Sequence, residues 1–118
     1  MRILLAEDNE MNVELFLATL RDDRHEVVVT RDGEAAKQRA LSEPFDLLVL
    51  DIQMPRLDGY SLCRELRAAG ITRPIVALSA DAMPADIARG VEGGFDAYLT
   101  KPVKVRDLRE TLHRLGGR

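Results

Sequence analysis

The sequence has little cysteine and few aromatic side chains. Cys63 is the only cysteine, so no internal disulfide can form, and its spacing with Leu62 and Leu66 predicts a buried, reduced thiol. Tryptophan is missing and aromatic residues make up only 4% of the chain, while the formal net charge is −3. This composition lacks the basic and aromatic surface that nucleic-acid-binding proteins use. We therefore expect no direct contact with nucleic acid.

Long apolar segments are also missing. No apolar run approaches the roughly 20 residues that a helix needs to cross a bilayer, and Met1 leads directly into a predicted strand without a signal-type segment. We expect no membrane contact and a cytoplasmic location. The 118 residues, of which 46% are hydrophobic, suffice for one core, and we expect a single domain over residues 1–118.

Short apolar segments alternate with helical patterns along the whole chain. Five segments rich in Val, Leu, Ile or Ala are predicted to be strands, near residues 2–6, 26–30, 46–50, 74–78 and 96–99. Five segments between and after them are predicted to be helices, near residues 10–22, 33–42, 58–70, 84–92 and 103–115. Repeated strand–helix units of this length favour an α/β fold, with right-handed crossovers and helices on both faces of a parallel sheet.

Charged side chains follow three of these predicted strands. Glu7 and Asp8 follow the first strand, Asp51 follows the third, and Lys101 follows the fifth. In open α/β sheets the ligand site lies beyond the carboxyl ends of the strands, so these side chains should converge in one pocket. Three carboxylates would repel one another unless a hard divalent cation, which prefers oxygen ligands, lay among them. The lysine would then suit an additional anion, such as a phosphoryl group.

Four ordered segments carry a resemblance to a known family. They are ILLAEDN at residues 3–9, LLVLDIQMPRLDG at 47–59, PIVALSA at 74–80 and AYLTKP at 97–102. In this order and at these separations they resemble the receiver domain of two-component response regulators, over essentially the whole chain. The resemblance implies a doubly wound, five-stranded parallel sheet of the flavodoxin-like order 2-1-3-4-5, which the alternation of elements alone leaves open.

The resemblance also implies a role for each carboxylate. Asp51 would be the phosphoacceptor, attacking the phosphorus of a phosphohistidine or of a small donor such as acetyl phosphate. Mg²⁺ would be bound by Asp8, by Asp51 and by the backbone carbonyl of Gln53, with Glu7 acting chiefly through water. The protein would assist its own phosphorylation and dephosphorylation without turning over an external substrate, so we do not expect an enzyme in the ordinary sense.

Further roles fall on the fourth and fifth strands. Ser79 would donate a hydrogen bond to one phosphoryl oxygen and Lys101 would pair with another. The Lys101–Pro102 peptide bond would be cis. On phosphorylation Ser79 would move toward the phosphoryl group and Tyr98 would turn inward, which would re-form the surface of the fourth helix, the fifth strand and the fifth helix.

The partners implied are a histidine kinase or a histidine phosphotransfer protein, together with an output protein that the sequence does not identify. Met11, Leu15 and Ala18 should lie on the face of the first helix opposite the core stripe that begins at Val13. We interpret Met11 and Leu15 as a docking patch for the helical hairpin of the phosphodonor. The alternative is that they are scattered surface apolar residues, which are common.

Three functions remain open at this point. The chain is expected to be a free-standing receiver that binds partners or relays phosphate, and the alternative is a receiver excised from a hybrid sensor kinase or a longer response regulator. A third possibility is a small phosphatase with an Asp nucleophile, of the haloacid-dehalogenase type. Those enzymes need a second Asp two residues after the nucleophile, where this chain has Gln53.

Overall fold

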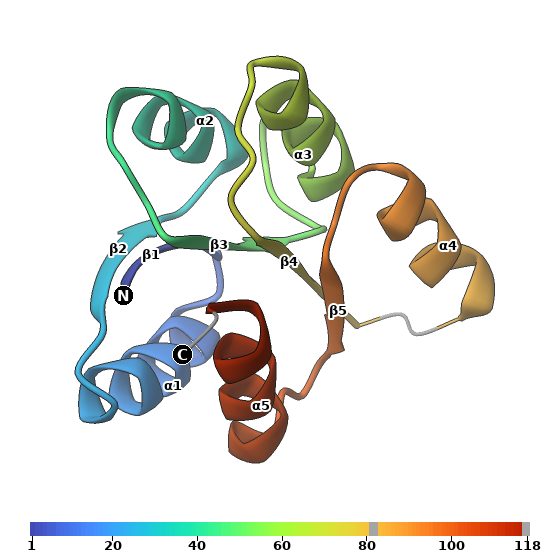
Figure 1. Ribbon diagram of the computed structural model, residues 1–118. Coiled ribbons are helices and arrows are strands. Elements are labelled where there is room, and N and C mark those ends of the chain that lie inside the picture. Colours follow the sequence, from blue (N-terminus) through green and yellow to red (C-terminus); the bar gives the residue numbers. More distant parts are fainter. Residues whose placement is uncertain (81–82, 117–118) are drawn as a thin grey trace.

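The computed structural model describes residues 1–80 and 83–116, in which strands and helices alternate from end to end (Figure 1). The strands are β1 (Arg2–Ala6), β2 (Glu26–Thr30), β3 (Leu47–Asp51), β4 (Ile75–Ser79) and β5 (Ala97–Thr100). The helices are α1 (Glu10–Asp22), α2 (Gly33–Ser42), α3 (Gly59–Ala68), α4 (Pro84–Glu92) and α5 (Val105–Gly116).

The strands form one parallel sheet in the order β2-β1-β3-β4-β5. Helices α1 and α5 cover one face, while α2 and α3 cover the other, with α4 beside β5 (Figure 1). This arrangement confirms the predicted α/β fold and its strand order. Because all strands run in the same direction, the segments that follow β1, β3, β4 and β5 emerge at the same edge of the sheet.

Two hydrophobic cores lie on the two faces of the sheet. In the central strands β3 and β4 every residue is buried, which explains their nearly continuous apolar sequence. Successive residues point to opposite faces, so Leu48 packs with α2 and α3 whereas Val49 packs with α1 and α5. Cys63 is fully buried in the first of these cores, as predicted, and burial raises the pKa of its thiol to about 11. At neutral pH this cysteine is therefore an unreactive core residue.

Side-chain caps mark the starts of α1 and α3. The Asn9 side chain accepts a hydrogen bond from the backbone N–H of Asn12 at the start of α1, and Asp58 accepts one from Ser61 at the start of α3. In the part of the chain that the structure describes, no helix is both long and apolar enough to cross a membrane.

Strands β3, β4 and β5 each begin and end one residue later than predicted. Two of these strands, β3 and β5, follow an aspartate that binds a neighbouring strand. The Asp46 carboxylate accepts a hydrogen bond from the backbone N–H of Arg2 at 2.7 Å, and the Asp96 carboxylate accepts one from Ile75 at 2.9 Å. The backbone N–H groups of Asp46 and Asp96 also donate to the carbonyls of Arg2 and Ile75, each at 2.8 Å. At the other ends, Asp51 and Ser79 are the last residues of β3 and β4.

Candidate functional site

Glu7, Asp8, Asp51 and Lys101 lie together at the carboxyl edge of the sheet. One carboxylate oxygen from each of the three acidic residues lies within 4.8 Å of the others. The Lys101 Nζ atom lies 2.8 Å from Oδ2 of Asp51 and 3.0 Å from Oε1 of Glu7. The three strand ends thus deliver three carboxylates and one ammonium group to a single cluster, which we call the carboxylate cluster.

The carboxylate cluster has a buried base and an open mouth. Glu7 and Asp51 are 0% and 2% exposed, whereas Asp8 is exposed to solvent. Burial, together with contact with Asp51, raises the pKa of Glu7 to about 7, although Lys101 acts in the opposite direction. Burial lowers the pKa of Lys101, but its contacts with Asp51 and Glu7 outweigh this effect and leave that pKa above its ordinary value. Lys101 carries one positive charge and contacts two carboxylates, so it cannot neutralise both when both are ionised.

Backbone N–H groups orient the two buried carboxylates. Oδ1 of Asp51 accepts a hydrogen bond from the backbone N–H of Gln53 at 3.1 Å, while Oδ2 faces Lys101. Oε2 of Glu7 accepts a hydrogen bond from the backbone N–H of Asn9 at 3.2 Å. Each carboxylate is thus held in position before any ligand arrives.

A glycine lets the loop after β3 return closely to the strand. A Cβ atom at Gly59 would lie 2.5 Å from the carbonyl oxygen of Asp51, a distance that forces the backbone to shift. The N–H of Gly59 donates to the carbonyl of Ile52 at 2.9 Å. The start of α3 is therefore fixed against the end of β3, which holds the backbone of Asp51 rigidly.

The donor set of the carboxylate cluster fits a hard divalent cation. Oε1 of Glu7 is buried and makes no hydrogen bond, although it lies 3.0 Å from the Lys101 ammonium group. A buried oxygen without a hydrogen bond is costly unless another partner, such as a cation, satisfies it. With oxygens of Asp8 and Asp51 beside it, the cluster offers the oxygen ligands that Mg²⁺ or Ca²⁺ prefers.

The ends of β4 and β5 are joined beside the carboxylate cluster. Ser79 is 2% exposed, and its carbonyl accepts a hydrogen bond from the backbone N–H of Lys101 at 2.7 Å. The Lys101–Pro102 peptide bond is cis. Tyr98 lies in the middle of β5 and is half-buried. The hydroxyl of Ser79 and the ammonium group of Lys101 thus belong to strand ends that are bonded to each other.

Two contacts near this site do not follow from the sequence patterns. Asn9 caps α1 with its side chain, and its backbone N–H also holds Glu7. Tyr60 draws no attention in the sequence, although its hydroxyl lies 3.4 Å from the hydroxyl of Tyr98. The one signal available for Tyr60 is its rarity, because the chain contains only two tyrosines.

An apolar patch on α1 begins only a few residues after Asp8 in the sequence. Met11 and Leu15 are 79% and 44% exposed, and Ala18 on the same face is exposed as well. On the opposite face Val13 and Phe16 are 1% and 2% exposed and belong to the protein interior. We call Met11, Leu15 and Ala18 the α1 patch. It begins in the first turn of α1, two residues after the cap residue Asn9 that follows Asp8.

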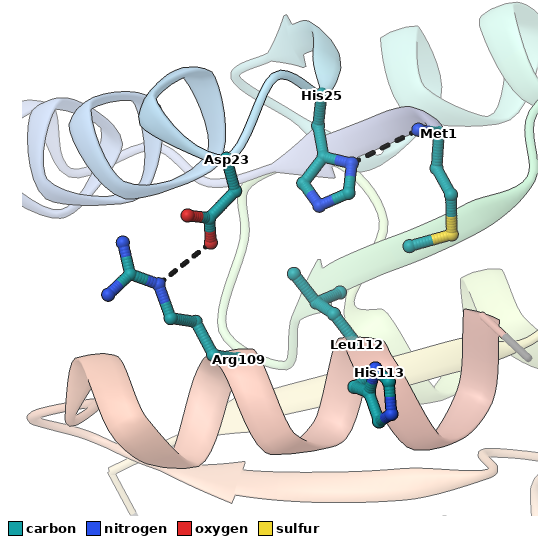
Figure 2. A pocket seen from close by; sticks show the side chains of 6 residues that line it. All are labelled: Met1, Asp23, His25, Arg109, Leu112 and His113. Atoms are coloured by element: carbon teal, nitrogen blue, oxygen red, sulfur yellow. Dashed lines mark hydrogen bonds and ion pairs between the residues drawn. The ribbon is translucent and has the colours of Figure 1, made fainter. Parts of the chain in front are cut away.

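A pocket of about 260 Å³ lies at the other edge of the sheet, where the strands begin. It is lined by residues from the start of the chain, the turn between α1 and β2, and α5, namely Met1, Asp23, His25, Arg109, Leu112 and His113 (Figure 2). The Arg109 Nε atom donates to Asp23 at 2.7 Å, and the Met1 amino group lies 3.0 Å from Nδ1 of His25. We call this the amino-end pocket.

Comparison with known proteins places the chain in a family. The family model of the response regulator receiver domain matches residues 3–113. The chain belongs to this family. Receiver domains are modules of phosphorylation-dependent signalling, and the fold and the acidic cluster of this receiver agree with that assignment.

Individual relatives are found both as regulators and within kinases. The receiver is 40% identical over 115 residues to the response regulator protein PmrA of Pseudomonas aeruginosa, covering 98% of this chain and 52% of PmrA. It is 39% identical to the two-component response regulator ORR41 of Oryza sativa, covering 91% of this chain and 87% of ORR41. The chain thus spans about half the length of some curated relatives that it matches and most of another.

A solved structure extends the comparison to the site. The receiver domain of sensor histidine kinase PA1611 from Pseudomonas aeruginosa superposes with a TM-score of 0.91 at 38% identity, covering 99% of this chain and 98% of that one. That structure has a magnesium ion coordinated in its active-site cleft. The similarity concerns the whole fold.

Proposed function

We propose that Asp51 accepts a phosphoryl group from the phosphohistidine of a histidine kinase or a histidine phosphotransfer protein, or from a small donor such as acetyl phosphate. The observation that carries this proposal is the way in which Asp51 is held. Its carboxylate is buried at a strand end, with Oδ1 fixed by the N–H of Gln53 and Oδ2 by Lys101. A carboxylate with fixed orientation and a cation beside it suits in-line phosphoryl transfer, which depends mainly on positioning and charge neutralisation.

In the transfer step, a carboxylate oxygen of Asp51 forms a bond to phosphorus while the phosphorus–nitrogen bond to the donor imidazole breaks. The electron pair of the broken bond stays on the imidazole nitrogen, and the donor leaves as neutral imidazole because its other ring nitrogen already carries a proton. The Lys101 ammonium group, 2.8 Å from Asp51, pairs with an oxygen of the incoming phosphoryl group. Ser79, at the end of the neighbouring strand, donates a hydrogen bond from its hydroxyl group to another of these oxygens.

Mg²⁺ is the cation that we propose for the carboxylate cluster. Asp8, Asp51 and the backbone carbonyl of Gln53 would bind it, and Glu7 would act chiefly through water. The proposal is supported by the three carboxylates that converge beside the single ammonium group of Lys101, and by the magnesium ion in the related kinase receiver. When bound, the ion neutralises negative charge on the carboxylates and on the transferred group.

The output side of the proposal involves α4 and β5. Ser79 and Tyr98 would move together on phosphorylation and change the surface formed by α4, β5 and α5. Two observations support a movable α4. Gly90 is its only fully buried residue, and its apolar side chains Ile87 and Val91 are 39% and 66% exposed, while Met83 just before the helix is 66% exposed. A helix with so little buried surface can change position at a small free-energy cost.

The α1 patch is the proposed docking surface for the protein phosphodonor. The exposure of Met11 and Leu15 supports this role, because large apolar side chains on an otherwise polar helix face gain free energy when a partner covers them. We further propose that residues 1–118 act as a signalling switch, either alone or as one module of a longer regulator or hybrid kinase, and not as an enzyme that turns over an external substrate.

A mass measurement tests the acceptor directly. Incubation with acetyl phosphate and Mg²⁺ should add the mass of one phosphoryl group, and Asp51→Asn should abolish this addition. Asp107→Asn, which makes the same change on α5, should leave it intact. Undiminished phosphorylation of Asp51→Asn would show that the acceptor is another residue.

A further inference from the structure

Tyr60 lies at the junction of α3, α4 and β5. It is in the first turn of α3, is 5% exposed, and belongs to the core on the side of the sheet that α2 and α3 cover. Its ring packs against Phe95 edge to face, with 6.2 Å between the ring centroids and an angle of 77° between the planes. The ring of Tyr60 is therefore fixed by the core, and its hydroxyl is held at a defined place.

The hydroxyl of Tyr60 contacts two of the three elements that form the proposed output surface, α4 and β5. It donates a hydrogen bond to the backbone carbonyl of Asp86 in α4 at 3.2 Å. Its oxygen also lies 3.4 Å from the hydroxyl of Tyr98 in β5. Because a carbonyl oxygen can only accept, the single proton of Tyr60 is directed to Asp86, and a lone pair of Tyr60 faces Tyr98. One oxygen atom thus joins α3, α4 and β5.

The ring of Tyr98 is also close to the backbone of α4. A Cβ atom at Gly90 would lie 3.1 Å from Cδ2 of Tyr98 and 3.3 Å from its Cε2. The missing side chain at Gly90 therefore leaves room for the Tyr98 ring against the helix. Tyr98 is held between Gly90 on one side and the Tyr60 hydroxyl at its polar end.

We propose that Tyr60 is a positioning residue for the switch: its hydroxyl stabilises the half-buried position of Tyr98 and ties that position to α4. An outward rotation of Tyr98 separates the two hydroxyls, so the Tyr60 contact favours the inward state. Because the same hydroxyl binds the Asp86 carbonyl, a displacement of α4 changes the contact with Tyr98. Tyr60 thereby sets how strongly phosphorylation of Asp51 is coupled to the α4–β5–α5 surface. This inference rests on the proposed function of Asp51 and Tyr98.

Two further features act on Tyr60. The Arg89 guanidinium group from α4 lies over the Tyr60 ring, 4.1 Å from its centroid, and adds a second contact between α3 and α4. Burial, together with the neighbouring Tyr98, raises the pKa of Tyr60 to about 12 and keeps its hydroxyl protonated, although the charge of Arg89 acts in the opposite direction. The contact is therefore present throughout the physiological pH range.

Tyr60→Phe tests the proposal because it removes one oxygen atom and keeps the ring. Protein labelled with ¹³C in its tyrosine rings gives signals from two residues only, and Tyr60→Phe leaves Tyr98 alone. The ratio of inward to outward Tyr98 should fall by about two- to tenfold, the range that one neutral hydrogen bond supplies. The Tyr98 signal should shift toward that of a solvent-exposed tyrosine, while the rate of phosphorylation by acetyl phosphate stays within about twofold of the original.

Arg64→Gln is the control on the same helix. It removes an exposed guanidinium group of α3, whose side chain contacts Ser61, and retains both tyrosine hydroxyls, so the Tyr98 signal should stay as in the original protein. If Tyr60→Phe leaves the Tyr98 signal unchanged, or if Arg64→Gln shifts it equally, the hydroxyl has no positioning role and the inference is overturned.

The same spectra separate this failure from failure of the proposed function. A Tyr98 signal that responds to acetyl phosphate and Mg²⁺ in the original protein, but is identical in Tyr60→Phe, overturns the role of Tyr60 alone. A Tyr98 signal that does not respond to phosphorylation in the original protein overturns the switch itself, and with it the coupling assigned to Tyr60.

Discussion

The two edges of the sheet both gather charged side chains, but they balance those charges differently. At the amino-end pocket, Arg109 pairs with Asp23 near the surface, where their side chains are 45% and 30% exposed (Figure 2). At the carboxylate cluster, Lys101 faces Glu7 and Asp51, which are both buried. Arg109 also lies 3.4 Å from Asp22, and solvent screens these exposed side chains, so the pair gains little from a further ligand. The buried cluster keeps an excess of negative charge that a cation can neutralise.

This difference shows why one cluster is suited to chemistry and the other to packing. Charges at the surface are screened by solvent and cost the folded state little free energy, whereas buried charges interact strongly with any ligand that enters their site. In the carboxylate cluster the fold holds two carboxylates close together at a cost in stability. That cost is recovered when a cation binds, which links ligand binding to the electrostatics of the site.

The largest difference between the two edges should appear when the basic side chain at each edge is replaced. Lys101→Met should slow phosphorylation by acetyl phosphate about 100-fold or more, because it removes a positioned donor to the transferred phosphoryl group. Arg109→Met, the same change at the amino-end pocket, should leave the rate within about twofold. Intact-mass time courses give both rates, and melting curves establish that both variants are folded. Equal loss of rate in the two variants would contradict the distinction between the edges.

The next effect concerns the stability of the ion-free protein as a function of pH. The pKa of Glu7 is about 7 in the folded protein, above its ordinary value, so the folded state binds the proton more tightly than the unfolded state does. The stability that the protonated form contributes is fully present below about pH 4.5 and is lost as the pH rises through about 7. Glu7→Gln, which is neutral at every pH, should therefore be more stable than the original protein at pH 8 by roughly 2–3 kcal/mol.

Urea unfolding in EDTA at pH 5 and pH 8 measures this effect. The two proteins should have similar free energies of unfolding at pH 5 and should differ at pH 8. Asp23→Asn at the amino-end pocket is the control, and it should lower stability by no more than about 1 kcal/mol, because it breaks a surface ion pair. A Glu7→Gln variant that is less stable than the original at pH 8 would show that the Glu7 carboxylate is not strained.

A smaller effect distinguishes the α1 patch from the chemistry at the cluster. Changing Met11 and Leu15 to Ser should slow phosphotransfer from a protein donor by about 5- to 30-fold, because a small apolar interface loses about 1–2 kcal/mol. Transfer from acetyl phosphate should not change, since the cluster is untouched. Leu41→Ser, at a large apolar residue that is 47% exposed on α2, is the matched control and should affect neither donor. Equal slowing with both donors would show that the substitutions disturb the site and not a docking surface.

Much of the fold could be predicted because the sequence patterns are local. Apolar runs mark the buried strands, and Asn9 and Asp58 mark helix starts through side chains that act within a few residues. The shift of β3, β4 and β5 could not be predicted in this way. The starts of β3 and β5 lie next to Asp46 and Asp96, whose carboxylates bond to strands far away in sequence.

The residues that gather at the site were also predictable, because strand ends in a parallel sheet meet at one edge. Their environments were not. Glu7 and Asp8 are neighbours in sequence, yet one is fully buried and the other is exposed. The contact between Tyr60 and Tyr98 joins two elements through side-chain positions that no local pattern encodes. Burial and side-chain contact are properties of the packed molecule, and they decide the pKa of Glu7 and the surroundings of Tyr98.

The most direct test of this account is a calorimetric titration of the EDTA-treated protein with Mg²⁺ at pH 6, in two buffers of different ionisation enthalpy. Because Glu7 is largely protonated at that pH when no ion is bound, we predict one bound ion with release of close to one proton, and much less release at pH 8.5. Asp8→Asn should weaken binding, and Glu7→Gln should abolish the proton release. Absence of Mg²⁺ binding, or binding at pH 6 without proton release, would contradict the claim that the carboxylate cluster holds strained negative charge for a cation.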